Sequence, residues 1–130
     1  MQSFRIKSMR ALAGRLGFRF VDRPLPSFFT MTCSPFDGNP LVWNVIEGQR
    51  NGTSVLVFDT VIGGGKGRYR TFIAVQTEGD PFVRKGNLSS GKTLQSNGWT
   101  AVYRVGLWVN PVGWTMSVQE IEKHLTDSRF

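Results

Sequence analysis

Residues 63–70 combine a glycine-rich backbone with three cationic side chains, in the order Gly-Gly-Gly-Lys-Gly-Arg-Tyr-Arg. Successive backbone N–H groups in a glycine-rich turn can form a concave site that binds an anion. Lys66, Arg68 and Arg70 stand where their side chains could close on a phosphate or a carboxylate. We therefore predict an anion-binding site at this turn. The alternative is an exposed hairpin tip with solvated charges.

A second segment, Gly-Asn-Leu-Ser-Ser-Gly-Lys-Thr at 86–93, matches the G-x-x-x-x-G-K-[ST] pattern of phosphate-binding P-loops. In such a loop Lys92 would contact the phosphates and Thr93 a magnesium ion. A P-loop opens a helix, because the helix N-terminus faces the phosphates. Here Asp80-Pro81 predicts a turn before the match, and Asn97-Gly98 and a predicted strand follow it. Nucleotide binding by residues 86–93, as part of an enzyme, is therefore the function that we favour least.

Other catalytic and metal-binding chemistry has few residues to use. The chain holds one cysteine, Cys33, and one histidine, His124. A single cysteine excludes an internal disulfide and any zinc site with several cysteines. We expect Cys33 in the apolar core and His124 on the surface of the last helix, where a cation favours the C-terminal dipole. We predict no catalytic residues, no metal and no cofactor, and so a protein that is not an enzyme.

Positive charge is the clearest pointer to a partner. The formal net charge is +7 and the isoelectric point about 10.3. Residues 1–23 carry six basic and one acidic side chain, a net +5, and residues 63–104 carry seven and two, also +5. Such a field attracts anionic lipid, acidic proteins or nucleic acid. In the N-terminal block, the residues that we expect to form a basic helix surface are Arg5, Lys7, Arg10 and Arg15.

Nucleic-acid binding is the alternative use of the same charge. Trp43, Trp99, Trp108 and Trp114 lie in or after predicted strands. Aromatic side chains on a sheet beside arginines can stack on the bases of a single strand. Core packing is the other use of these tryptophans, and no Arg-Gly-Phe-type signature of sheet-based RNA binders accompanies them.

Two helices are predicted, one near each end of the chain. Apolar residues recur with helical spacing from Met9 to Leu16 and predict an amphipathic helix over 4–16, which ends at Gly17. Ser117 and Glu120 have the S-x-x-E spacing of a capping box and predict a helix over 118–126.

Strands are predicted between the helices. Asn51-Gly52, a strong hairpin signal, separates predicted strands at 41–48 and 54–62, and further strands are predicted at 69–77 and 99–109. We expect a short edge strand within 28–33 and a loop over 86–98. The pattern predicts an α+β fold: one domain over 1–130, with an antiparallel, curved sheet of four to six strands, an N-terminal helix and a C-terminal capping helix.

Several of these segments resemble a bacterial family of small, uncharacterised α+β domains. The resemblance lies in Leu-Ala-Gly-Arg-Leu-Gly-Phe at 12–18, Asn-Val-Ile-Glu-Gly at 44–48, Val-Leu-Val-Phe-Asp at 55–59 and Thr-Phe-Ile-Ala-Val at 71–75. The strand that begins at Trp99 and the last helix are similar too, so that the resemblance covers about residues 10–126. The chain departs from the pattern at Thr60, where an aromatic residue is expected. The resemblance brings no catalytic residues.

Together these observations favour a non-enzymatic bacterial binding domain that recognises an anionic partner. An anionic lipid surface or an acidic protein is the expected partner, and nucleic acid is the alternative. We expect the protein in the cytoplasm, with the inner face of the membrane as a candidate location.

Overall fold

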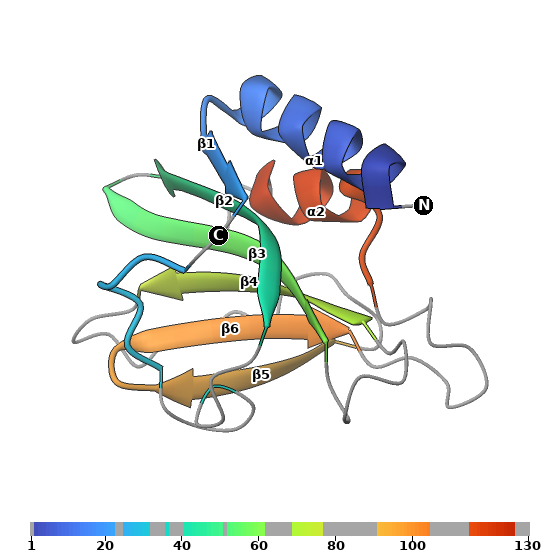
Figure 1. Ribbon diagram of the computed structural model, residues 1–130. Helices are drawn as coiled ribbons and strands as arrows, with labels where there is room; N and C mark the ends of the chain where they lie inside the picture. The colour runs from blue at the N-terminus through green and yellow to red at the C-terminus, as the bar shows by residue number, and fades with distance from the viewer. Residues whose placement is uncertain are drawn as a thin grey trace.

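The computed structural model describes residues 2–22, 25–31, 36, 41–50, 52–61, 69–76, 91–104 and 115–126. They form two helices and six strands (Figure 1). The helices are α1 (Gln2–Leu16) and α2 (Val118–Thr126). The strands are β1 (Arg19–Asp22), β2 (Val42–Arg50), β3 (Thr53–Val61), β4 (Tyr69–Gln76), β5 (Gly91–Ser96) and β6 (Trp99–Arg104).

All six strands belong to one antiparallel sheet in the order β1-β2-β3-β4-β6-β5. Figure 1 shows α1 and α2 side by side on one side of this twisted sheet. The predicted α+β class, with an antiparallel sheet and a helix near each end of the chain, is confirmed. The hairpin predicted at Asn51-Gly52 is confirmed as well, since Arg50 pairs with Thr53 across it.

The helix ends are fixed by the local signals in the sequence. Gly17 takes a left-handed φ of 73°, and the N–H groups of Gly17 and Phe18 donate to the carbonyls of Gly14 and Ala13. This pair of bonds is the Schellman motif, which satisfies carbonyls that the helix itself leaves open. At α2 the Ser117 hydroxyl accepts from the N–H of Glu120, and the Glu120 carboxylate accepts from the N–H of Ser117. The predicted capping box is thus present.

Apolar side chains cover both faces of the sheet. On one face the buried stripe of α1, including Met9 and Leu12, meets Val55 and Val57 of β3 and Ile121 of α2. On the other face an aromatic core gathers around Phe58, Phe72 and Trp99. The partly buried Leu25, Phe29 and Phe36 and the buried Met31 pack on that second core, so residues 25–31 and Phe36, which belong to no strand, cover this face.

Two predictions about strands were wrong. The range 86–98 was expected to be a loop, but 91–96 forms β5, and a turn at Asn97-Gly98 joins it to β6 with φ of 50° and 82°. Polar residues suit β5 because it is the last strand in the sheet order. The short edge strand expected within 28–33 is absent from its described part, 28–31, and the sheet ends at β1 and β5 instead. The expected strand at 99–109 is described as far as Arg104.

Gly48 lies where the sheet meets the ring that follows α1. A Cβ on Gly48 would overlap the ring of Phe18, and the neighbouring ring atoms include the one nearest the Phe18 backbone. We expect Gly48→Ala to lower the free energy of unfolding by about 1–3 kcal/mol, because a well-packed site must move to admit a methyl group. Urea unfolding followed by tryptophan fluorescence measures this change.

Gly14 provides the matched control in the same measurement. It lies in α1 with no atom in the way of a Cβ. Gly14→Ala should raise the free energy of unfolding by about 0.5–1 kcal/mol, since alanine loses less backbone entropy in a helix. Equal effects of the two substitutions would contradict the packing argument.

Candidate functional site

Arg5 turns inward and is the centre of a buried polar cluster. Its Nε and Nη2 donate to the two carboxylate oxygens of Asp59, each at 3.0 Å, and Nη1 donates to the carbonyl of Met116 at 2.6 Å. Thr71 Oγ1 donates to Asp59 at 2.7 Å and accepts from Arg5 Nη2 and from the N–H of Met116. Asn44 Nδ2 also donates to Asp59, at 3.0 Å. We call these five residues the Arg5–Asp59 cluster.

A β-bulge brings Asn44 into this cluster. The register of β2 against β3 shifts between Trp43 and Ile46, and Asn44 takes a left-handed φ of 56°. Asparagine tolerates this conformation better than most side chains. Its backbone N–H donates to the carboxylate of Asp22, which itself has a φ of 75° at the bulge between β1 and β2. Two irregular strand ends thus meet at Asn44, whose side chain donates to the buried Asp59 carboxylate.

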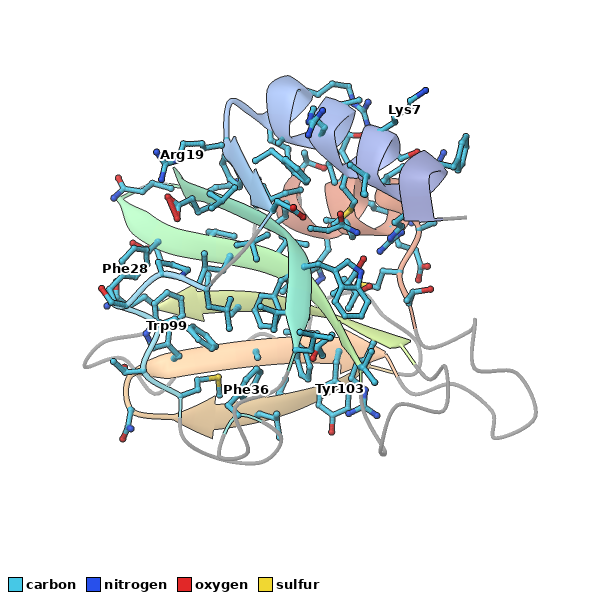
Figure 2. The ribbon with its side chains drawn as sticks, in the orientation of Figure 1. Lys7, Arg19, Phe28, Phe36, Trp99 and Tyr103 are labelled. Atoms are coloured by element: carbon cyan, nitrogen blue, oxygen red, sulfur yellow. The ribbon has the colours of Figure 1, made fainter. Side chains whose placement is uncertain are left out.

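The outward face of α1 holds the other basic residues predicted for the helix. Lys7, Arg10 and Arg15 are exposed, as is Phe4, of which 77% is accessible to solvent. Figure 2 shows Lys7 pointing away from the sheet. The structure therefore separates the four predicted helix residues: three lie on the outer surface, whereas Arg5 is bound to Asp59 inside. Sequence reasoning did not single out Phe4, although an aromatic residue outside the Met9–Leu16 stripe was a usable signal.

The three outward cations differ in how they are held. Arg15 makes an ion pair with Glu122 of α2 at 2.9 Å, so part of its charge is compensated within the chain. The guanidinium of Arg10 lies 5.0 Å from the ring centre of Phe20, a cation–π contact that leaves its charge uncompensated. Among the residues that the structure describes, neither Lys7 nor Arg10 forms an ion pair, so this part of the face keeps its positive charge. We call Phe4, Lys7, Arg10 and Arg15 the α1 outer face.

The predicted anion site at the glycine-rich turn is described only at Arg70, because Lys66 and Arg68 lie outside the described residues. Arg70 stands in β4 with its guanidinium 4.3 Å from the ring centre of Tyr103 and 5.9 Å from that of Phe72. Burial lowers the pKa of Arg70, and the interaction with Tyr103 acts in the opposite direction. Arg70 therefore packs on the aromatic core of the sheet.

The described part of the P-loop match lies in a β-strand, whereas a P-loop requires the start of a helix. Gly91, Lys92 and Thr93 form the start of β5 and pair with β6, and residues 86–90 lie outside the described ranges. A P-loop lysine and threonine begin a helix whose N-terminus faces the phosphates. The described part of the motif, residues 91–93, is therefore not at a helix N-terminus.

His124 was predicted on the surface, and this prediction was wrong: only 2% of it is exposed. It stands three residues after Ile121 and next to Leu125, on the inward side of α2. Cys33 lies outside the described residues. Among the residues that the structure describes, no group of three or more His, Cys, Asp or Glu side chains is placed to hold a metal ion.

The burial of Trp99 does not fit a role in base stacking. Trp99 is 1% exposed, and its ring packs against Phe28 and Phe29. Trp108 and Trp114 lie outside the described ranges. Trp99 therefore serves the core of the second face and offers no surface to a base.

Comparison with protein-family models, with curated proteins and with solved structures gives no match to this chain. The resemblance to a family of small bacterial domains thus stays a prediction. In the described parts of the chain, neither helix is long and apolar enough to cross a membrane. The candidate functional site with the best-defined geometry is the α1 outer face.

The Arg5–Asp59 cluster predicts unequal effects of two arginine substitutions in one helix. Arg5→Met should lower the free energy of unfolding by about 3 kcal/mol, because it leaves the buried Asp59 carboxylate without its cation. Arg15→Met should change it by less than about 1 kcal/mol, because the Arg15–Glu122 pair is largely exposed. Thermal and urea unfolding of both variants test this difference. Equal losses would show that the cluster does not anchor α1.

Proposed function

We propose that this protein is a non-catalytic binding domain that attaches reversibly to an anionic lipid surface through the α1 outer face. The observation that carries the proposal is the exposure of Phe4, at 77%, on the same helix face as Lys7 and Arg10. A helix that presents an aromatic side chain together with cations suits the boundary between lipid headgroups and acyl chains.

The remaining surface of α1 fits the same use. Ala11 and Gly14 are exposed between the cations, so small side chains allow the helix to approach a flat surface closely. The opposite side of the helix is fully used in the core, where Met9, Leu12 and Ala13 are buried. The helix can therefore lie on a membrane without leaving the sheet.

The expected affinity is low. Each lysine or arginine near an anionic leaflet contributes about 1 kcal/mol, and burial of a phenylalanine side chain contributes about 1.5–3 kcal/mol. With Arg15 partly compensated by Glu122, the face supplies about 4–6 kcal/mol, which corresponds to a Kd between about 1 mM and tens of micromolar lipid. Such binding is reversible and sensitive to salt. The inner face of the cytoplasmic membrane, which carries anionic lipid, is the proposed location.

Vesicle co-sedimentation tests this proposal. We expect the protein to bind vesicles that contain phosphatidylglycerol and not vesicles of phosphatidylcholine alone. The double variant Lys7→Gln/Arg10→Gln should bind about 30-fold more weakly, since two cations are lost. Phe4→Ser should weaken binding while leaving its dependence on salt unchanged, because it removes only apolar contact.

The control variant Arg19→Gln/Lys123→Gln removes the same charge from exposed positions outside α1. It should bind almost as well as the original protein. Equal weakening by the two double variants would mean that net charge, and not the α1 outer face, determines binding. Tighter binding to a mixed oligonucleotide or to an acidic protein than to vesicles would contradict the lipid surface as the partner.

A further inference from the structure

A hollow of about 500 Å³ opens on the face of the sheet that the helices do not cover. The pairs Arg19–Glu47 and Gln49–Ser54 place these side chains on the same face as Leu56 of the aromatic core. The hollow is lined by side chains from four strands and one loop, namely Arg19, Phe28, Glu47, Gln49, Ser54 and Gln76. It is therefore distinct from the α1 outer face.

Most of the lining residues that the structure describes are polar, although they expose more apolar than polar surface to the hollow, and their charges cancel. Arg19 and Glu47 form an ion pair at 2.8 Å, so that one positive and one negative group cancel. Gln49, Gln76 and Ser54 add amide and hydroxyl groups, which both donate and accept hydrogen bonds. A ligand that suits this lining is neutral and has several groups that both donate and accept hydrogen bonds.

Phe28 forms an aromatic wall at the rim of the hollow. Its ring stacks on Trp99 at a centre-to-centre distance of 6.1 Å and an interplanar angle of 19°, and 47% of the residue stays exposed. Trp99 Nε1 donates to the carbonyl of Phe28 at 3.3 Å, which ties the segment to β6. Figure 2 shows Arg19, Phe28 and Trp99 along the same side of the molecule. The wall is thus held in place before a ligand arrives.

We infer that this hollow binds a neutral saccharide. The apolar C–H side of a sugar ring packs on an aromatic face, which is Phe28 here. The sugar hydroxyls, which donate and accept, match the glutamine amides, Ser54 and the Arg19–Glu47 pair. The size of the hollow lies within the usual range of small-molecule sites.

Two other ligand classes fit less well. A peptide that adds a strand would lie along the outer edge of β1 and not over the hollow, because β2, β3 and β4, which supply most of the lining, are paired on both sides. A nucleotide needs uncompensated cations, but Arg19, the cation among the described residues of the lining, is paired with Glu47. The experiment below therefore also tests whether a peptide or a nucleotide binds.

The test is a titration of the 130-residue protein with maltose, cellobiose and N,N′-diacetylchitobiose, followed by NMR of the glutamine side-chain amides and the tryptophan indole N–H groups. We expect saturable shifts with one of these disaccharides at a Kd on the order of 1 mM, because the contact area is small. The Kd should not change with sodium chloride concentration, because the ligand is neutral. No saturable shift, or shifts caused only by a peptide or a nucleotide, would overturn the inference.

Phe28→Leu should weaken saccharide binding by about tenfold, because it keeps apolar contact and removes the aromatic face. Phe4→Leu is the control, since Phe4 is also an exposed phenylalanine but lies on α1, and this variant should bind the saccharide as before. Gln49→Ala removes a hydrogen-bonding side chain from the lining at an exposed position. This second variant keeps the test valid even if Phe28→Leu fails to fold. Unchanged affinity in both Phe28→Leu and Gln49→Ala would refute the site. Phe28→Leu and Gln49→Ala should both bind vesicles as the original protein does, so the experiment tests the saccharide site independently of the lipid-binding proposal.

Discussion

The Asp59 carboxylate and its cation Arg5 are the constraint on which the arrangement of the elements depends. Asp59 is 2% exposed and accepts hydrogen bonds from Arg5 of α1, Asn44 of β2 and Thr71 of β4. A carboxylate in this position must keep its partners, because an uncompensated buried charge is costly. Apolar contacts alone would allow α1 to turn about its own axis on the apolar face of the sheet. The ion pair between Arg5 and Asp59 selects one of these orientations. With about 100° between successive helix residues, an inward Arg5 places Lys7 on the outside.

Signals that act over a few residues could be predicted from the sequence, because backbone sterics and local hydrogen bonds determine them. Gly17, Ser117 and Asn51-Gly52 each specify a conformation that few other residues supply as well. The same reasoning failed at 91–96, although Asn97-Gly98 carries the same turn signal. The polar composition of β5 outweighed that signal. An end strand needs few apolar residues, so turn chemistry was the more reliable guide there.

The pairing of residues far apart in the sequence could not be predicted. The position of Arg5, Asp59 and His124 within the apolar pattern, however, indicated burial that their polar side chains did not suggest. Arg5 stands four residues before Met9, on the apolar stripe of α1, and Asp59 continues the alternation of Val55 and Val57. A charge at such a position implies a buried partner, yet nothing local identifies Asp59, 54 residues away, as that partner. Similarly, helical spacing from Ile121 places His124 inward, whereas its polarity argued for the surface.

The two proposed surfaces differ in their physics but share one stretch of backbone. Binding at the α1 outer face rests on uncompensated charge and weakens with salt, whereas the hollow is neutral and rests on shape and hydrogen bonds. Gly17 ends α1, and Arg19, two residues later, lines the hollow. Between them, the ring of Phe18 packs over Gly48 of β2, leaving no room for a Cβ. Arg19 is held in the sheet by its pairing with Glu47 of β2, so the short turn at Gly17 and Phe18 joins the end of α1 directly to the lining of the hollow.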